Sequence, residues 1–282
     1  MFATPDLSKV QELREENTRE VLNFLNIRPV HTVVMMSFIT DNGLTSELNR
    51  GKFFGYRNAE GTLEGVALIG HSTLVEARTD KALHALAIQA RSSETPLHLI
   101  MSSGTDAAKF WQHLTNGLTE PRLTSTEALF EVAFPFPVRK TEREIRNADM
   151  SNLIAVAEAQ AEVAFMECGV DPMLKDREGF LKRVARRIEQ NRVFVVTDGD
   201  ELIFKADIIA ETAECIYLEG IYVGEKYRGQ GIGSDCLSKL TVDLLGRTSN
   251  ICMLSNVDFE AAHRSYAKAG FKNTDECTTL FV

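Results

Sequence analysis

The chain has 282 residues, of which 44% are hydrophobic and 25% are charged, and its formal net charge is −9. This length is enough for one large domain or two domains of ordinary size, and the composition is normal for a soluble globular protein. Because nucleic-acid-binding proteins usually carry a basic face, and the basic stretch at 182–192 has the spacing of a solvated helix surface, we expect no nucleic-acid partner.

The first half of the chain combines helical and strand patterns. Apolar spacing predicts a helix over residues 7–25, and a proline start with a glycine stop favours a second helix from near Pro29 to just before Gly43. Two strands, at 52–57 and 63–69, flank a hairpin turn. The other elements of this half are a helix at 82–90, a strand at 97–101, a helix at 106–114 and a strand at 129–134. The segment Pro135-Phe136-Pro137 favours an extended linker, because proline removes backbone donors and disfavours helix before it.

The second half has a similar order of elements. Asp149 is placed to cap a helix that runs to about Glu167, and Asp176 to cap a second helix with one apolar face. Strands at 193–197 and 202–210 flank Asp198-Gly199, the strongest hairpin dipeptide of the chain. The remaining elements are a strand at 215–223, a helix at 231–245, a strand at 251–254 and a helix at 259–269 that Gly270 stops.

The two halves resemble copies of one ancestral unit. Lys52-Phe53-Phe54 matches Arg192-Val193-Phe194 at an offset of 140 residues, and Ala107-Ala108 matches Ala261-Ala262 at an offset of 154. The first copy is therefore 14 residues shorter, and the shortfall falls where the second copy carries a glycine-rich loop. We therefore predict two domains, residues 1–137 and residues 138–282.

Cysteine and histidine usage argues against disulfide and metal frameworks. The chain has five cysteines with no C-x-x-C pair and six histidines with no H-E-x-x-H motif. We therefore expect that the protein binds no metal and that its thiols are free, as in a reducing compartment. The first ten residues lack a signal-peptide pattern, and the most apolar early block, 30–39, is too short to span a bilayer. We therefore expect a cytoplasmic protein without a membrane partner.

The glycine-rich loop Arg228-Gly229-Gln230-Gly231-Ile232-Gly233 lies between a predicted strand and a predicted helix. Glycines allow positive φ and close approach, successive backbone N–H groups can form an anion-binding nest, and the helix adds its positive end. The loop therefore favours a phosphate or diphosphate ligand over a plain turn. It is not a Walker loop, because no Lys-Ser or Lys-Thr follows, and its glycine spacing differs from the Rossmann G-x-G-x-x-G.

The same loop resembles the R/Q-x-x-G-x-G/A motif of the GNAT superfamily, the Gcn5-related N-acetyltransferases. Leu218-Glu219-Gly220-Ile221-Tyr222-Val223 is similar to the family's preceding strand, Asn256 stands where the family often has asparagine, and Tyr266-Ala267-Lys268-Ala269-Gly270-Phe271 resembles its Y-x-K-x-G-F ending. The resemblance covers about residues 139–282. It implies an α/β fold of the α+β type, with tandem GNAT-like domains. Each would have a mixed, mostly antiparallel sheet flanked by helices, with a degenerate N-terminal copy and a splayed-strand acetyl-CoA cleft in the C-terminal one.

The resemblance further implies an acyltransferase that moves an acetyl group from acetyl-CoA to a primary amine in a ternary complex. Glu219 would be the general base and Tyr266 the general acid. The predicted coenzyme-binding residues are Ile221, Tyr222, Val223, Lys226, Tyr227, Arg228, Gly229, Gln230, Gly231, Ile232, Gly233 and Asn256. An exposed strand carboxylate, a core tyrosine and a helix cap beside Asp258 are the structural alternatives for Glu219, Tyr266 and Asn256, respectively.

Two other functions remain open at this point. The domain could bind or sense an acyl-CoA without catalysis, or the glycine loop could be only a turn in a scaffolding protein. The acceptor, a small molecule or a peptide amine, and the oligomeric state do not follow from the sequence. In the first half Gln112 and Ser102 stand at the positions of Tyr266 and Asn256, so we expect no coenzyme site there.

Overall fold

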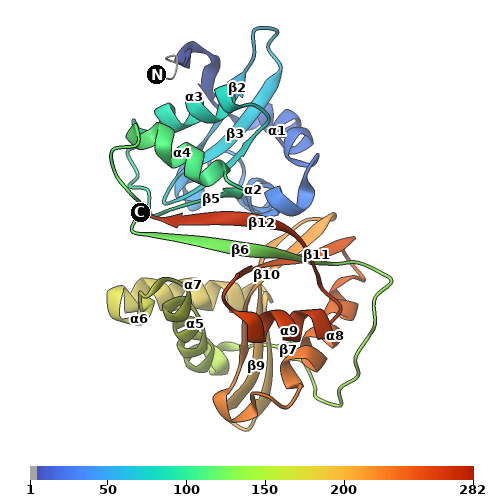
Figure 1. Ribbon diagram of the computed structural model, residues 1–282. Coiled ribbons are helices and arrows are strands. Elements are labelled where there is room, and N and C mark those ends of the chain that lie inside the picture. Colours follow the sequence, from blue (N-terminus) through green and yellow to red (C-terminus); the bar gives the residue numbers. More distant parts are fainter. Residues whose placement is uncertain (1–4) are drawn as a thin grey trace. The chain divides into compact units, whose positions relative to one another are not determined.

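The computed structural model describes residues 5–282, and the chain divides into two compact units (Figure 1). Unit 1 comprises the residues up to Ala128 together with Asp275–Val282, and unit 2 comprises Leu129–Thr274. The boundary expected between residues 137 and 138 therefore differs from the division by contacts, which lies nine residues earlier and returns the last segment to unit 1.

Unit 1 is built on a sheet with the strand order β1-β2-β3-β4-β5-β12. Neighbouring strands are antiparallel except for β4 and β5, which are parallel. Its elements are η1 (Leu7–Lys9), β1 (Val10–Glu12), η2 (Glu15–Asn17), α1 (Thr18–Leu25), α2 (Pro29–Asn42), η3 (Glu47–Asn49), β2 (Gly51–Arg57), β3 (Leu63–Gly70), β4 (Ser72–Ala77), α3 (Asp80–Ala90), β5 (Leu99–Ser103) and α4 (Asp106–Thr115), with β12 (Lys272–Phe281) as the last strand.

Unit 2 repeats this plan with the strand order β7-β8-β9-β10-β11-β6, and here β10 and β11 are the parallel pair. Its elements are β6 (Leu123–Val132, shared with unit 1), β7 (Arg146–Asn147), η4 (Met150–Asn152), α5 (Leu153–Cys168), α6 (Pro172–Lys175), α7 (Arg177–Glu189), β8 (Val193–Asp198), β9 (Glu201–Glu211), β10 (Cys215–Val223), η5 (Glu225–Tyr227), α8 (Ile232–Leu244), β11 (Asn250–Asn256) and α9 (Glu260–Lys268). The tandem α/β architecture expected from the sequence is therefore present.

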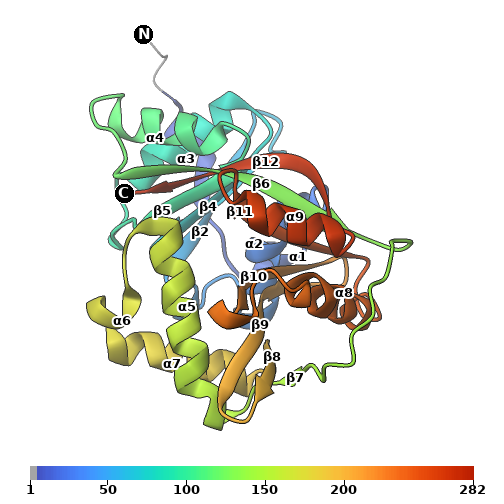
Figure 2. The same cartoon turned by 60° about the horizontal axis from the view of Figure 1, so that its bottom comes forward.

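Helices pack against the strands in both units (Figure 2), and apolar side chains are buried between them. In β3, Val66 and Leu68 pack with α1 and α2, whereas Ala67 and Ile69 pack with α3 and α4, as the two-residue period of a strand requires. In unit 2, α5 and α7 cover the face that carries Val193 and Val195. Strands with two covered faces lose the alternation of buried and exposed residues, and neither β3 nor β9 has an exposed residue.

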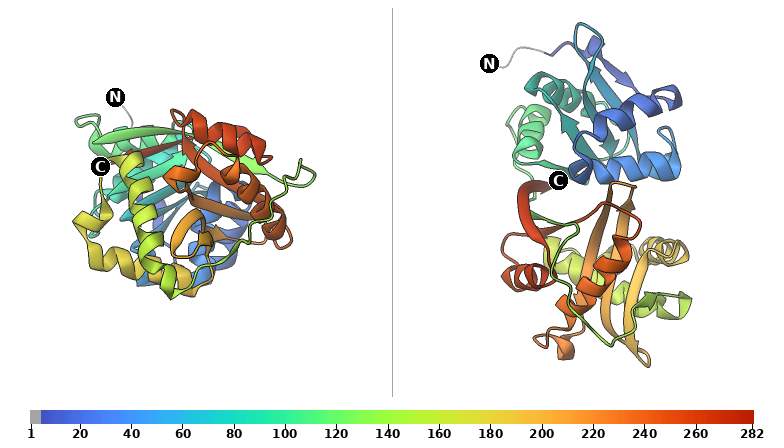
Figure 3. Two further views of the ribbon diagram at one scale, coloured as in Figure 1. Left: turned by 90° about the horizontal axis from the view of Figure 1, so that it is seen from below. Right: turned by 90° about the vertical axis from the view of Figure 1, so that its right-hand side faces the viewer.

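Each sheet ends in a strand taken from the other half of the sequence. Residues Cys277–Phe281 of β12 pair antiparallel with Leu99–Ser103 of β5 in unit 1. The last part of β6, from Leu129 onward, belongs to unit 2, where β6 is the neighbour of β11 in the strand order. The two halves therefore exchange their final strands (Figure 3).

The structure corrects one predicted element. Residues 7–25 do not form one helix, because Val10–Glu12 pair with β2 and the α-helix begins only at Thr18. The backbone N–H of Leu13 also donates to the carbonyl of Phe53, so this stretch continues the sheet edge rather than closing helical turns. Other predicted elements shift in length: the strand expected at 129–134 starts at Leu123 and ends at Val132.

Within the described residues 5–282, no helix is long and apolar enough to cross a membrane.

Candidate active site

The candidate site is a cleft of about 790 Å³ in unit 2, formed where β10 and β11 separate. The registered pairs of these parallel strands end at Tyr217 opposite Cys252, and the strands continue beyond that point to Val223 and Asn256. The cleft is lined by the end of β10, the glycine-rich loop, the start of α8, the end of β11, α9 and part of α5. Eleven of the fourteen predicted site residues line it: Glu219, Ile221, Tyr222, Val223, Tyr227, Arg228, Gly229, Gly231, Ile232, Gly233 and Tyr266.

The glycine-rich loop needs its glycines for two different reasons. Gly229 and Gly231 have φ of 77° and 82°, a region that residues with a Cβ atom rarely adopt. A Cβ on Gly229 would meet no atom within 4 Å, so conformation rather than crowding selects glycine there. At Gly233 a Cβ would lie 3.0 Å from Cγ2 of Val223, so glycine there lets α8 approach β10 closely.

Helix α8 directs its N-terminal end into the cleft. It begins at Ile232, and Ile232, Gly233 and Ser234 all line the cleft. The first N–H groups of a helix have no partner within the helix, and together they carry about half a positive elementary charge. This end, with the glycines before it, is a site that favours an anion.

Strand β10 bends beside the cleft at a β-bulge. Glu219 lies opposite Asp207 of β9, and Tyr222 lies opposite Lys205, so Gly220 and Ile221 face the single residue between them on β9. Gly220 has φ of 59°, and both bulge residues line the cleft. The bulge interrupts the regular ladder where the strand edge meets the cleft.

Tyr266 of α9 is buried at the cleft wall, with 9% of its surface exposed. Its hydroxyl is hydrogen-bonded to Ser255, whose Oγ lies 3.2 Å from Nε2 of His263, and its ring meets that of Phe130 at 5.5 Å. Burial, with Glu167 nearby, raises the pKa of Tyr266 to about 12. The phenol therefore keeps its proton at neutral pH.

Glu219 is half-buried on β10 and accepts a hydrogen bond of 2.7 Å from the hydroxyl of Tyr217. Its neighbour in the bulge, Gly220, separates it from Ile221, and all three line the cleft. A carboxylate with one neutral donor keeps acceptor capacity for a substrate proton. The position expected for a base is therefore occupied by a group that faces the cleft.

Arg228 connects the loop to α5. Its guanidinium donates to Glu162 at 2.8 Å and to the carbonyl of Val223 at 2.9 Å, and it lies over the ring of Tyr222. The hydrogen bond to Glu162 raises the pKa of Arg228. Arg228 is thus a fixed positive charge at the cleft rim.

Three predicted coenzyme-binding residues are not among those that line the cleft. Lys226 pairs with Glu201 at 2.6 Å, and the side-chain amide of Gln230 donates to the carbonyl of Lys226 at 2.9 Å. The side-chain oxygen of Asn256 accepts from the backbone N–H of Asp258 at 2.8 Å, two residues before α9 begins at Glu260, so it does not cap that helix. Their predicted binding role stays a prediction.

Sequence reasoning missed a buried ionic group behind β10. Lys205 of β9 is fully buried and Asp207 is 1% exposed, and their charged atoms lie 2.9 Å apart. Arg187 of α7 donates to the other carboxylate oxygen of Asp207 at 2.8 Å. The available signal was a lysine and an aspartate two residues apart within an otherwise apolar strand, Leu202-Ile203-Phe204-Lys205-Ala206-Asp207-Ile208.

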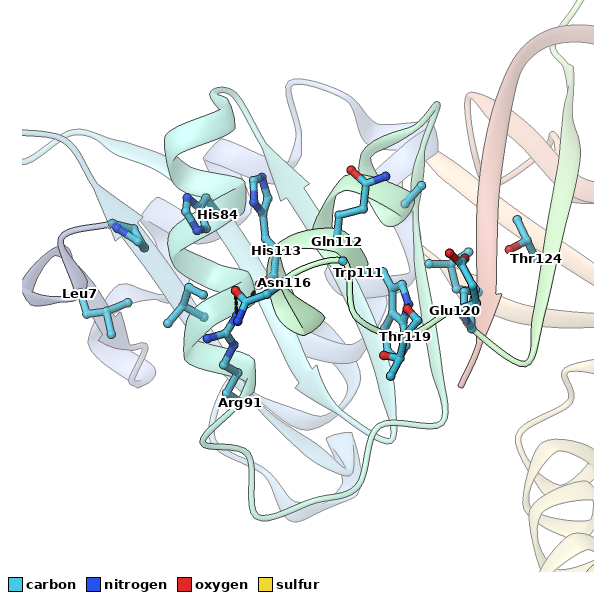
Figure 4. Close-up of a pocket in the computed structure, with 16 residues that line it drawn as sticks. Leu7, His84, Arg91, Trp111, Gln112, His113, Asn116, Thr119, Glu120 and Thr124 are labelled. Atoms are coloured by element: carbon cyan, nitrogen blue, oxygen red, sulfur yellow. Dashed lines mark hydrogen bonds between the residues drawn. The ribbon is translucent and has the colours of Figure 1, made fainter. Parts of the chain in front are cut away.

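Unit 1 has a hollow of about 630 Å³ with different chemistry (Figure 4). The rings of His84 and His113 stack at 4.1 Å, and burial lowers the pKa of His84. Arg91 donates to the carbonyls of His113 and Leu114 at the end of α4, so it stabilises that helix end. No glycine loop borders this hollow in the described part of unit 1, and it does not repeat the cleft of unit 2.

Among residues 5–282, no three His, Cys, Asp or Glu side chains are grouped so as to hold a metal ion.

Comparison with known proteins assigns the class of unit 2. Residues 189–273 match the family model described as an acetyltransferase (GNAT) domain, a segment that contains β10, the glycine loop and Tyr266. The chain therefore carries a GNAT acetyltransferase domain, and this family supports acyl transfer as the general activity. No curated protein matches the chain in sequence.

Solved structures share the architecture of the whole chain. An acetyltransferase of the GNAT family from Colwellia psychrerythraea is 14% identical with a TM-score of 0.61, over 97% of this chain and 99% of that one. A Drosophila protein is 12% identical with a TM-score of 0.67, over 97% and 98%. A tandem GNAT protein from the clavulanic acid biosynthesis pathway is 11% identical with a TM-score of 0.58, over 96% and 98%. At these identities the likeness concerns the fold, which is that of a tandem GNAT protein.

Proposed function

We propose that unit 2 is an N-acetyltransferase that moves an acetyl group from acetyl-CoA to a primary amine by direct attack in a ternary complex. The observation that carries this proposal is the meeting of three features in one cleft: an anion-binding loop, a bulged strand edge and a buried, protonated Tyr266. Each would serve a different part of the reaction.

The residues of the cleft fit a nucleotide thioester. Gly229 and Gly231 leave open space where a Cβ would otherwise stand, and the positive end of α8 begins beside them. The pyrophosphate would lie against Gly229, Gly231 and Gly233, with Arg228 beside it. The edge of β10 from Ile221 to Val223 would pair with the extended pantetheine arm. Acetyl-CoA, when bound, supplies an activated acyl group.

The protein groups at the other end of the cleft would supply the proton transfers. A free alkyl ammonium has a pKa near 10, so the acceptor amine must lose a proton, and Glu219 is the cleft carboxylate on the bulged strand that would accept it. The backbone N–H of Ile221 would donate to the thioester carbonyl oxygen as its negative charge develops. Tyr266 would protonate the departing thiolate.

Two measurements test the proposal. Calorimetric titration with acetyl-CoA should give saturable heat, and a panel of primary amines should release free thiol from acetyl-CoA with at least one acceptor. Absence of binding heat and of any thermal shift would leave the cleft without a coenzyme. Binding without thiol release for any amine would favour the alternative, a non-catalytic acyl-CoA-binding or sensing protein.

Tyr266→Phe separates these two functions. We expect it to lower kcat about 100-fold, because it removes a general acid, while the acetyl-CoA dissociation constant stays within about threefold. The matched control is Gln112→Leu on α4 of unit 1, which should leave kcat unchanged. If Tyr266→Phe keeps the wild-type kcat, Tyr266 is a core tyrosine and not the acid.

A further inference from the structure

The bulge of β10 has an unusual support beneath it. The ammonium of Lys205 lies 3.2 Å from the carbonyl oxygen of Gly220, 2.6 Å from Oε1 of Gln160 on α5 and 2.9 Å from Asp207. An ammonium has three N–H donors, and here three acceptors surround it. Lys205 is fully buried, so none of this charge is solvated by water.

Only glycine at position 220 leaves room for the Lys205 ammonium and the Gln160 side chain. A Cβ at Gly220 would lie 2.6 Å from Nζ of Lys205 and 2.4 Å from Oε1 of Gln160, distances that real Cβ atoms do not show. The lysine and the glutamine thus occupy the space against the bulge that any other residue at position 220 would need. A glycine at position 220 is therefore what lets Lys205 and Gln160 lie against the bulge.

The contact with Gly220 fixes the direction of the next N–H group. The peptide unit that joins Gly220 to Ile221 is planar and trans, so its C=O and N–H point to opposite sides. The C=O is turned toward Lys205, which does not line the cleft, whereas Ile221 does line it. The N–H of Ile221 is therefore turned away from Lys205, and Ile221 itself lines the cleft.

We propose that Lys205 is a positioning residue for acyl transfer, because its hydrogen bond to the Gly220 carbonyl holds the Ile221 N–H toward the acyl group of the bound thioester. This inference rests on the proposed function. A cation on the C=O also polarises the peptide and strengthens its N–H as a donor. Gln160 and Asp207 hold the ammonium in place, and Arg187 donates to the other carboxylate oxygen of Asp207, so two cations share this one carboxylate.

Infrared spectroscopy of bound acetyl-CoA, labelled with ¹³C at the acetyl carbonyl, measures this directly. In the wild-type protein the thioester C=O stretch should lie at lower frequency than in free acetyl-CoA, because the carbonyl oxygen accepts a hydrogen bond from the Ile221 N–H. In Lys205→Met the frequency should return toward the free value. We also expect kcat to fall about 10- to 100-fold, with the acetyl-CoA dissociation constant within about threefold, because a misplaced donor weakens the transition state.

Removing one buried charge can unfold a protein, so a second variant is needed. Lys205→Met/Asp207→Leu removes the lysine and its carboxylate together; Arg187 then loses Asp207 as a partner, but its side chain is 27% exposed, so water can solvate its charge. The double variant should fold and show the same carbonyl frequency and kcat loss as Lys205→Met. Arg187→Met is the matched control. It alters the same buried group without touching the bulge, and it should keep the wild-type frequency and kcat.

The outcomes separate the two proposals. A folded Lys205 variant with the wild-type carbonyl frequency and kcat would overturn the role of Lys205. An unchanged carbonyl frequency of the thioester bound to the wild-type protein would also overturn this role, and that measurement needs no variant. A lowered frequency that Lys205→Met abolishes, without transfer to any amine, would keep the role of Lys205 and reject the N-acetyltransferase.

Discussion

The two units share a strand order and differ at the junction after the fourth strand. In unit 1, β4 ends at Ala77 and α3 begins at Asp80. In unit 2, β10 ends at Val223 and α8 begins at Ile232, so eight residues fill a gap that two residues fill in unit 1. The comparison teaches that a unit can keep its sheet and core while lacking the loop that would bind an anion.

The carboxylates on β4 and β10 also differ, in their burial and in the groups that bind them. Glu76 of β4 is 3% exposed and is bound by Arg28 and Arg78, so both of its neighbours neutralise it. Glu219 of β10 is half-buried and accepts from one neutral hydroxyl. Two arginines bind the carboxylate of Glu76, whereas a tyrosine hydroxyl donates to that of Glu219, which lines the cleft.

We expect the largest effect when the chain is divided into its two halves. A fragment 138–282 lacks Leu129–Val132, including Phe130, whose ring packs on Tyr266, and a fragment 1–137 lacks the β12 partner of β5. We expect neither fragment alone to unfold cooperatively in urea, because each sheet loses a terminal strand. Co-expression of both should restore a cooperative transition. A fragment that folds alone would show that strand exchange is dispensable.

Alkaline pH should affect unit 2 through Tyr266. Its folded pKa of about 12 exceeds the value near 10 of an exposed phenol, so between these values the folded state holds a proton that the unfolded state has lost. The associated stability is fully present below pH 10 and is lost as pH rises through 12, by about 2–3 kcal/mol. Urea unfolding at pH 9 and pH 11.5 should therefore show a steeper loss for the wild type than for Tyr266→Phe. Equal slopes would contradict the buried phenol.

Two glycines with positive φ, one in each unit, allow a matched comparison of backbone strain and ligand binding. Gly231 in unit 2 and Gly104 in unit 1 both have positive φ, of 82° and 53°, and a Cβ would meet no atom within 3.5 Å at either. Alanine should therefore cost about 1 kcal/mol of strain at each. Only Gly231→Ala should weaken acetyl-CoA binding in calorimetry, about 10-fold, because only that glycine lines the cleft. A similar loss for Gly104→Ala would mean that the effect is indirect.

The smallest effect is expected at Lys226. Its ammonium pairs with Glu201 outside the cleft lining, and both side chains are exposed, so their interaction is screened by solvent. Lys226→Met should change the acetyl-CoA dissociation constant by about threefold or less at physiological salt. A change beyond tenfold would place Lys226 over the ligand, as the sequence motif predicts.

Local elements could be predicted well from the sequence, but the strands that the two halves exchange could not. Gly229, Gly231 and the apolar run before them indicated a strand, a loop and a helix, because turn chemistry and periodicity act over a few residues. The strand exchange did not follow, because Cys277–Phe281 and Leu99–Ser103 are far apart in sequence and no local pattern states which strands pair. The helix expected over 7–25 was wrong for a related reason, since pairing of Val10–Glu12 with β2 overrides its apolar spacing.

The candidate site was likewise predictable in its contiguous part. Residues 219–233 came from one stretch of chain, and most of them line one cleft. Lys205, Gln160 and Phe130 come from three other elements and meet the site only through the folding of the sheet. The sequence shows a lysine in an apolar strand, but only the fold shows that it lies against the bulge.

The exchanged strands also set an order for biosynthesis. Residues 275–282 leave the ribosome after both Leu99–Ser103 and all of Leu129–Thr274, yet they complete the sheet that contains β5. The first part of unit 1 is synthesised before its last segment, Asp275–Val282, which begins 172 residues after β5 ends at Ser103 and is translated about 10–35 s later at ordinary elongation rates. Until then the edge of β5 lacks this partner, and an unpaired strand edge can pair with other chains.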